Sequence, residues 1–483
     1  MEKVMLSEAT RKKWAPIIEH KALPVISDSY RRNVTSILLE NQERFLREDS
    51  LQGISGTGLG TVGSGGTFGS TSGIDAFDPI LISLVRRAMP NLMAYDIAGV
   101  QPMNGPTGLI FAMKNRYGNT DGSAVNSSGF RSGDEALYNE SLNKSGAANT
   151  QFGQGDDMFA GEAGATSGSY EKGTAHPTTT AERMGSAGNA FNEMTFSIEK
   201  TSVTAKSRAL KAEYTTELAQ DLKAVHGLDA ETELANILST EIMFEINREL
   251  VRTIYDVAKL GCKQSDLASA TSVWGNSVTG GAYNLELDSD GRWSAEKFRG
   301  LTFQIERECN VIGAQTRRGK GNFLVCSPDV AAALSMSGLL DFSPAFSGQL
   351  NTDVNGNTFA GTLHQGRIKV YIDPYSMPTN YDDFTPLNFV CVGYKGTSPY
   401  DAGLFYCPYV PLQMVRAVDT STFQPKIGFK TRYGMVSNPF VMNTSTQRPD
   451  GEAMTRRSNQ YYRLFRVDNL HGNDATFNPT SAN

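Results

Sequence analysis

One pattern in the sequence has the spacing of a known chemical site, a glycine triplet of the kind that cradles phosphates. Gly58, Gly60 and Gly63 match the G-x-G-x-x-G spacing of dinucleotide-binding loops. Such a loop holds a pyrophosphate only when a strand precedes it and a helix follows it at once. Here a Gly/Ser-rich tract lies on both sides of the triplet. We therefore interpret the triplet as low complexity and predict no cofactor.

The histidines and cysteines form no catalytic or metal-binding constellation in the sequence. The histidines lack a second ligand at metal-site spacing, and the widely spaced cysteines include no C-x-x-C pair. Nucleophile-elbow and P-loop motifs do not occur either. We predict no catalytic residue, no metal and reduced core thiols, which makes a soluble enzyme with Gly-rich loops an unfavoured alternative. The residues concerned are His20, His176, His226, His364, His471, Cys262, Cys309, Cys326, Cys391 and Cys407.

Composition and charge favour a large assembly subunit over a nucleic-acid or membrane protein. The chain has 483 residues, 39% of them hydrophobic, which suffices for two or three domains with ample cores. Its formal net charge of -6 disfavours general nucleic-acid binding, because phosphate contacts need a surplus of Lys and Arg. The sequence has neither an apolar run of membrane-spanning length nor a charged leader before an apolar segment. We expect a cytoplasmic protein that binds no membrane.

The elements that position any functional surface begin with an apolar block between two Gly/Ser-rich tracts. Residues 78–118 form this block, and the tracts cover residues 49–77 and about 117–189. Apolar residues at helical spacing predict a helix over 80–89, which Pro90 ends, and a strand over 109–113. The tracts are too poor in apolar residues to offset the entropy of ordering them, so we expect a flexible arm and a long loop.

The second half of the sequence predicts a long helix and then a mixed α/β region. Apolar residues alternate over 194–205, which indicates a strand or paired ribbon. Helical spacing predicts a helix over 229–260 with Asp229 as N-cap and Gly261 as C-cap, a rod of roughly 45 Å. Residues 293–417 predict alternating helices and strands, and the tail returns to a β pattern.

Several irregular strings between residues 78 and 440 resemble the major capsid proteins of T-even-like tailed bacteriophages. They include VRRAMPNLMAYDIAGVQPMNGPTG, DAGLFYCPYVPL and FQPKIGFKTRYGMVSNPF. The resemblance implies an α+β chain with the Hong Kong 97 (HK-97-like) phage capsid fold. The parts it implies are an N-terminal propeptide (1–48), a flexible N-terminal arm (49–77), a peripheral-domain anchor (78–116), an extended loop with a Gly/Ser-rich insertion (117–211), the spine helix and peripheral domain (212–292), the axial domain (293–417), and a return to the peripheral domain with a C-terminal tail (418–483).

The same resemblance implies a structural function. Hexameric capsomers of the chain would form the icosahedral or prolate head shell of a virion, which encloses double-stranded DNA without binding it specifically. Implied partners are the vertex protein, portal, scaffold, maturation protease and, as options, decoration proteins and an assembly chaperone. The alternative within this class is the pentamer-forming vertex paralogue. The family's folded insertion domain is not expected here, because the corresponding interval is short and Gly/Ser-rich.

The resemblance also implies removal of an N-terminal segment by a protease that cuts after Leu or Ile, any residue, then Glu. Two positions match: Leu46 to Glu48 before Asp49, and Leu38 to Glu40 before Asn41. We favour the cut before Asp49, because proteases need extended substrate and this site borders the Gly/Ser-rich tract. Residues 1–48 carry nine Lys/Arg and seven Asp/Glu, a net charge of +2, so their removal would shift the chain from -6 to -8.

Three charged groups have both a functional and an ordinary interpretation. Candidates for contacts between subunits lie on the expected ribbon, where a solvated edge is the alternative: Glu199, Lys200, Lys206, Arg208 and Lys211. Candidates for the rim of an axial pore lie in a Gly-rich loop, where a plain surface loop is the alternative: Arg317, Arg318 and Lys320. Charges of the long helix are expected to pair within the helix more often than between subunits: Glu241, Glu245, Arg248, Glu249 and Arg252.

Overall fold

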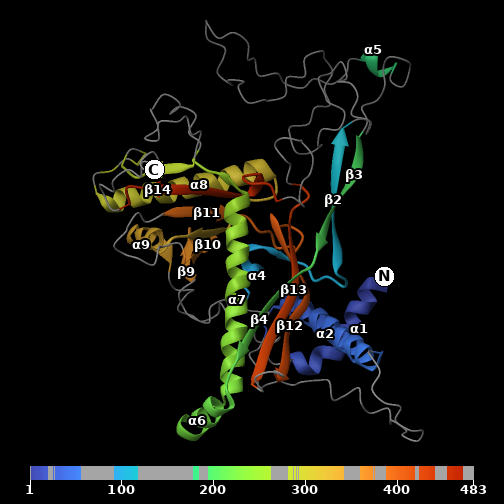
Figure 1. Ribbon diagram of the computed structural model, residues 1–483. Helices are drawn as coiled ribbons and strands as arrows, with labels where there is room; N and C mark the ends of the chain where they lie inside the picture. The colour runs from blue at the N-terminus through green and yellow to red at the C-terminus, as the bar shows by residue number, and fades with distance from the viewer. Residues whose placement is uncertain are drawn as a thin grey trace, which may run out of the picture. The chain divides into compact units, whose positions relative to one another are not determined.

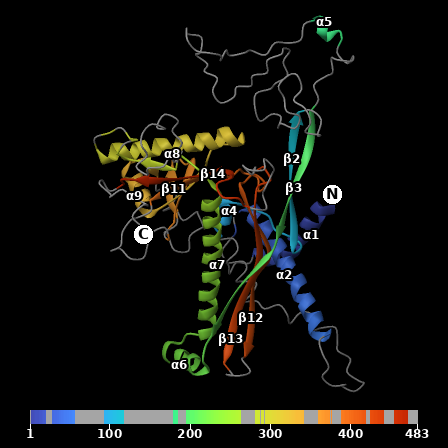
Figure 2. The same cartoon turned by 45° about the horizontal axis from the view of Figure 1, so that its top comes forward.

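The computed structural model divides the chain into two compact units, shown in two views in Figures 1 and 2. The larger unit combines Met1–Leu109 with Ser202–Asn483, and the smaller unit is Ile110–Thr201. The predicted helix over 80–89, the glycine triplet and the Gly/Ser-rich tract apart from residues 117 and 178–183 lie outside the described residues. The structure describes residues 2–19, 26, 28–55, 92–117, 178–183, 194–262, 281–286, 288–289, 291, 293–341, 359–373, 375, 388–418, 424–440 and 454–470.

Four strands of the larger unit form its first sheet. Their order is β1 (Gly99–Val100), β12 (Leu404–Val418), β13 (Pro425–Ser437) and β4 (Lys206–Glu213). β12 and β13 are antiparallel over most of their length, and β4 pairs antiparallel with the outer edge of β13. Along β13, Ile427, Phe429 and Tyr433 are buried at alternate positions, because one face of this sheet covers the core.

Eight further strands form the second sheet of the larger unit. Its central strands β11 and β7 are buried at every position, because the sheet is covered on both faces. The parallel pair β7 and β10 is joined through a helix, α9 (Pro328–Met336), as parallel strands require. The order is β5 (Ala258–Leu260), β14 (Asn459–Asp468), β11 (Phe389–Gly393), β7 (Phe323–Cys326), β10 (Ile368–Ile372), β9 (Phe359–Leu363) and β8 (Leu340–Asp341), and β6 (Ala282–Asn284) pairs with β14 off this path.

A long helix, α7 (Ala230–Val257), contacts strands of both sheets, namely β4, β13 and β14 (Figure 1). Its buried residues recur at three- and four-residue spacing, as expected for one stripe facing a core. The helix predicted over 229–260 is thus confirmed except at its end. Ala258–Leu260 pair with β14 as strand β5 instead of adding a last turn, so Gly261 is not a C-cap. The buried stripe is Ala235, Leu238, Ile242, Ile246, Leu250, Ile254 and Val257.

Two other helices flank these elements. α8 (Ser294–Thr316) packs on β14 and β11 through a buried stripe from Phe298 to Ile312. α6 (Thr216–His226) precedes α7 and has a Thr215 N-cap and Gly227 in the left-handed region at φ 66°. Glycine suits that cap because it has no Cβ to clash there.

The N-terminal segment folds as two helices, α1 (Glu2–Ile18) and α2 (Ser29–Ser55). α2 packs on β12, and the short helix α4 (Ala94–Ile97) precedes β1. The sequence placed the start of a flexible arm at Asp49, but α2 continues to Ser55. A helix tolerates the single Gly53 at a cost of about 1 kcal/mol, which explains why the chain stays helical until the glycines become dense.

The smaller unit is described mainly through a two-stranded ribbon (Figure 2). β2 (Thr107–Tyr117) and β3 (Met194–Thr204) form this sheet, and the first residues of β2 and the last residues of β3 belong to the larger unit. A short helix, α5 (Thr178–Ala181), is also described. The strands predicted over 109–113 and 194–205 are therefore confirmed.

The sequence did not predict the partners of three strands. β4, most of which lies in the predicted extended loop (117–211), pairs with β13. β12, which overlaps the end of the predicted axial domain (293–417), belongs to the four-stranded sheet. β14, which lies in the predicted return to the peripheral domain (418–483), pairs with β11 in the eight-stranded sheet. Alternating polarity identifies a strand without specifying its partner, and the division of the chain into these parts stays a prediction.

Within the described residues, no helix has both the length and the apolar character needed to cross a bilayer.

Candidate assembly surfaces and maturation segment

α1 and the first part of α2 pack together as a helical hairpin, residues 2–44, which we call the N-terminal hairpin. Trp14 is 3% exposed, and its Nε1 donates to Glu40 Oε2 at 2.9 Å. Lys13 Nζ lies 2.9 Å from the same carboxylate oxygen and also contacts Glu43. Burial opposes ionisation of Glu40, but the hydrogen bonds from Trp14 and Lys13 outweigh it and lower the pKa of Glu40. The hairpin is thus held by both packing and charge.

The hairpin packs against the rest of the larger unit through polar contacts of α2 near β1. Tyr30 donates its hydroxyl hydrogen to the Val100 carbonyl. Arg31 Nη2 lies 3.2 Å from Asp96 Oδ1, and both side chains are mostly buried. The Arg31 guanidinium also lies over the Tyr95 ring, 5.1 Å from its centroid. A buried, hydrogen-bonded ion pair is costly to break from one side only, so Arg31 anchors the hairpin.

A second docking point lies near the middle of α2. The Asn41 side-chain nitrogen donates to two main-chain carbonyls, that of Met103 at 2.8 Å and that of Tyr409 at 3.0 Å. Leu38 and Leu39 are each 1% exposed and belong to the main hydrophobic core. The inner face of α2 therefore combines apolar burial with satisfied main-chain acceptors.

Both predicted cleavage motifs lie within α2. The motif at Leu38, Glu40 and Asn41 lies in the docked part, because Leu38 and Asn41 are buried. The motif at Leu46, Glu48 and Asp49 is also helical, although the sequence suggested extended chain there. A protease needs several residues of extended backbone, so cutting at either motif requires local unwinding of α2.

The ribbon of β2 and β3 carries apolar side chains that the chain does not cover. Phe111 and Met113 on β2 are 62% and 63% exposed, and Phe196 and Ile198 on β3 are 66% and 64% exposed. These residues occur at every second position, so they share one face of each strand. Lys200 at the end of this stretch is exposed, and Glu199 is half-buried. We call Phe111, Met113, Phe196 and Ile198 the ribbon stripe.

The remaining subunit-contact candidates lie on β4, in the four-stranded sheet. Arg208 is engaged within the chain, with Nη1 2.8 Å from Glu245 and Nη2 2.5 Å from Glu249 on α7. Lys211 pairs with Glu213 at 3.1 Å on the surface, and Lys206 is exposed. The structure thus uses Arg208 to tie β4 to α7.

The charges of α7 pair with other elements rather than within the helix as predicted. Glu249 also accepts from the Tyr433 hydroxyl on β13. Arg248 Nη1 lies 2.8 Å from Asp373 Oδ1, and its guanidinium lies over the Tyr375 ring. The prediction failed because α7 has neighbours on two sides, and these offer shorter contacts than its own next turn.

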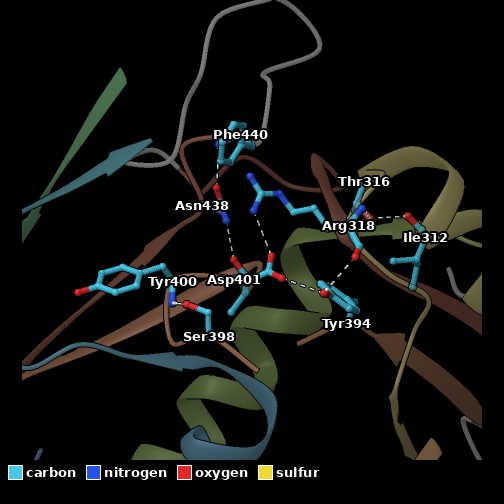
Figure 3. A network of polar contacts seen from close by, with 10 residues as sticks. Ile312, Thr316, Arg318, Tyr394, Ser398, Tyr400, Asp401, Asn438 and Phe440 are labelled. Atoms are coloured by element: carbon cyan, nitrogen blue, oxygen red, sulfur yellow. Dashed lines mark hydrogen bonds and ion pairs between the residues drawn. The ribbon is translucent and has the colours of Figure 1, made fainter. Parts of the chain in front are cut away.

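Among the pore candidates, Arg318 belongs to a polar network that joins the two sheets (Figure 3). Its Nη1 lies 3.4 Å from Asp401 Oδ1, and its guanidinium lies 4.4 Å from the centroid of the Phe440 ring. Tyr394, just after β11, donates to Asp401 Oδ2 at 2.8 Å. Asn438, just after β13, donates to the Ala402 carbonyl and accepts from the Phe440 amide. The network fastens the loop after α8 to the ends of β12 and β13.

The other two pore candidates are less constrained. Arg317 follows α8 with φ 55°, in the left-handed region, and is exposed. Lys320 is exposed as well. Arg318 is also exposed, and differs from these two in its ion pair with Asp401.

Sequence patterns did not reveal several residues that make polar contacts between distant parts of the chain. Asn41, Asp96 and Asp401 stand alone in the sequence, with no partner at helical or strand spacing. Their partners are distant along the chain, so only a three-dimensional arrangement pairs them. A weak signal existed for Asn41, which interrupts an otherwise apolar helical face after Leu38.

The described residues offer no arrangement for catalysis or metal binding that competes with these surfaces. All five cysteines are free thiols and buried, as predicted. Burial raises the pKa of Cys391 to about 12, so its thiol is unreactive at neutral pH. Within the described part of the chain, no group of three or more His, Cys, Asp or Glu side chains has the geometry of a metal site.

Comparison with known proteins identifies what the chain resembles. The family model for major capsid protein Gp23 matches residues 74–467. The major capsid protein of Enterobacteria phage T4 is 36% identical over 499 residues, covering 89% of this chain and 91% of that protein. The capsid vertex protein of the same phage is 28% identical over 262 residues, covering 51% of this chain and 53% of its own. Similarity is therefore more extensive to the major capsid protein than to the vertex paralogue.

Among solved structures, the chain is similar to the capsid of Myoviridae phage XM1, which is 9% identical, with 78% of this chain and 92% of that chain covered and a TM-score of 0.37.

Proposed function

The chain belongs to the Gp23 family of major capsid proteins, and on this premise we propose how its copies build a shell. It is a structural protein of the capsid of a tailed bacteriophage, with the α+β capsid fold expected from the resemblance. We propose that it forms hexameric capsomers, that these enclose double-stranded DNA without specific binding, and that it has no enzymatic activity. Assembly would take place in the cytoplasm of the bacterial host.

The observation that carries this proposal is the ribbon stripe. Four large apolar side chains on one two-stranded ribbon are each more than 60% exposed. An isolated two-stranded ribbon is marginally stable, and an uncovered apolar face on it gains free energy when a second surface covers it. Repeated contacts between identical chains supply such a surface in a closed shell. We propose that a neighbouring copy covers the ribbon stripe, with Glu199 and Lys200 at its polar rim.

The remaining charged candidates take different roles in this proposal. Lys206 and Lys211 are available for contacts between copies, whereas Arg208 stabilises the subunit itself through its two glutamates. Arg317 and Lys320 are the proposed positive rim of a capsomer pore, and Arg318 supports them by fixing the loop to Asp401. The vertex protein, portal, scaffold and decoration proteins remain proposed partners.

Maturation by cleavage after Glu48 is proposed as a step that follows assembly. The cut would separate the N-terminal hairpin from the rest of the chain, with a change in net charge from -6 to -8. Because the motif lies inside α2, the step requires local unwinding. Mass spectrometry of purified virions tests the site: an N-terminus at Asp49 supports it, and an intact N-terminus in mature virions contradicts it.

The shell itself is tested by co-expression with the scaffold and a chaperone, followed by negative-stain microscopy. Shells, tubes or capsomers are expected from the native chain. Persistent monomers under these conditions would contradict the proposal. A Phe196→Asp chain that assembles as well as the native one would contradict the role of the ribbon stripe, and Thr179→Asp, an exposed change in α5, serves as the control.

A further inference from the structure

The contact between the N-terminal hairpin and the rest of the chain has the composition of a protein–protein interface. It contains a desolvated charged pair, Arg31 with Asp96, and a buried amide, Asn41, that binds two main-chain carbonyls. Around these polar points lie large apolar side chains, including Leu38 and Leu39, that share one core with the body. Tight protein–protein interfaces combine such anchor residues with surrounding contacts that exclude water.

None of these contacts depends on the covalent connection. The last of them on the hairpin side is made by Asn41, and the proposed cut lies beyond it, after Glu48. Breaking the peptide bond there removes none of the contacts named above. It removes the high effective concentration that a tether gives its two ends.

We propose that the surface beneath the hairpin is a binding site in its own right, whose occupant is the N-terminal segment of this chain held without a covalent link. Cleavage then leaves the hairpin bound, and its departure is the separate step that uncovers the site. The inference rests on the proposed maturation for its biological role, but the binding site is a property of the uncut subunit.

Departure of the hairpin has a defined electrostatic consequence. Asp96, whose side chain is 9% exposed, loses Arg31 as its partner. The charge of Lys395 still interacts with Asp96, but loss of the hydrogen-bonded partner of a buried carboxylate is unfavourable, so it resists release of the hairpin. The main-chain carbonyls of Val100, Met103 and Tyr409 also lose the donors supplied by Tyr30 and Asn41. Buried acceptors left without donors add to that resistance.

The test separates cutting from release by using an artificial cleavage site. A recognition sequence for a sequence-specific protease is inserted after Gly66 in the full chain, and the cut protein is passed over a gel-filtration column. The expected result is that the fragment, residues 1–66 with the remainder of the inserted sequence, elutes with the body. Arg31→Ala and Asn41→Ala are each expected to weaken retention about tenfold, since each removes contacts equivalent to one such step in affinity.

Matched controls guard against unfolded variants. Arg11→Ala changes an exposed arginine on α1 and should leave retention unaltered. Thermal unfolding of the uncut chains shows whether Arg31→Ala and Asn41→Ala retain the fold of the body. Free elution of the native fragment at micromolar concentration would overturn the proposal, as would native-like retention of both variant fragments. Failure of the phage protease to cut after Glu48 would refute the proposed maturation site while leaving this binding site standing.

Discussion

The N-terminal hairpin and the ribbon differ in how far their apolar residues are buried. In the hairpin, Trp14 and Leu38 are 3% and 1% exposed and belong to the core of the larger unit. In the ribbon, Phe111 and Phe196 are 62% and 66% exposed. The apolar side chains of the hairpin are buried within their own chain, whereas those of the ribbon stripe are exposed and available for contact with another chain.

This difference separates two kinds of contact that a shell subunit needs. A contact made within the subunit is present before assembly and is removable later, which suits a segment proposed to be cut away. A contact with a second copy does not contribute to the stability of the free subunit and becomes favourable only on assembly. Substitutions in the hairpin should therefore change the stability of the subunit, and substitutions in the ribbon stripe should change its assembly.

The largest effect is expected from the ribbon stripe. Phe111→Asp combined with Phe196→Asp should lower shell yield by at least about tenfold, because charge replaces the apolar contact surface. The unfolding free energy of the isolated subunit should change by less than about 0.5 kcal/mol, since both side chains are exposed. Microscopy counts of shells and denaturant unfolding measure the two quantities. A large loss of subunit stability in the double variant would contradict the prediction that the ribbon stripe contributes to assembly and not to the stability of the subunit.

The reverse pattern is expected for the hairpin. Leu38→Asp buries a carboxylate in the core and should destabilise the docked hairpin by about 3–5 kcal/mol. Hydrogen exchange of residues 29–44 in the unassembled chain would report the loss. Arg11→Asp, which places the same carboxylate at an exposed site of α1, should leave exchange of this segment unchanged.

A smaller effect links the hairpin to a lysine of the body. Burial lowers the pKa of Lys395 to about 8, the charge of Asp96 opposes this, and the charge of Arg31 lowers the pKa further. An ordinary lysine in the unfolded chain holds its proton between about pH 8 and 10.5 whereas the folded chain releases it, so the contribution of Lys395 to stability should rise with pH there. The five buried thiols, whose pKa burial raises, contribute in the opposite sense. The difference in unfolding free energy between the native chain and Lys395→Met, measured by denaturant unfolding at several pH values, should therefore show this rise. Arg31→Gln should move its onset to higher pH, and ribbon variants should not.

The smallest effect concerns the pairs inside the hairpin. The pKa of Glu40 is lowered, so its contribution is present above the pKa of the unfolded chain and is lost as pH falls through the folded value. Because Lys13 is 45% exposed, Lys13→Met should cost only about 0.5 kcal/mol at neutral pH. Unfolding followed by tryptophan fluorescence measures this cost, and it should vanish in acid. An equal cost at low pH would indicate lost packing rather than a lost ion pair.

The sequence predicted the elements whose signal is local. α7 and β3 followed from apolar periodicity, and the buried cysteines from their spacing. The partners of β4 and β14 did not follow, because pairing joins residues hundreds of positions apart. The length of α2 was underestimated because a change in composition was taken as the end of a helix.

Prediction of the functional surfaces had the same limit. Exposure of the ribbon stripe is invisible in the sequence, since Phe111 and Phe196 look like core residues of ordinary strands. Arg208 was a candidate for contacts between subunits and Arg318 for the rim of an axial pore, and both form ion pairs inside their own chain. The sequence gives the sign of each charge, but which oppositely charged residue pairs with it depends on the fold.

Hydrogen exchange of the same chain before and after assembly tests the central contrast most directly. We predict that residues 29–44 are protected in the free subunit, and that residues 110–117 and 194–201 become protected only in assembled shells. Protection of the ribbon already in the free subunit, together with rapid exchange of the hairpin, would contradict the account.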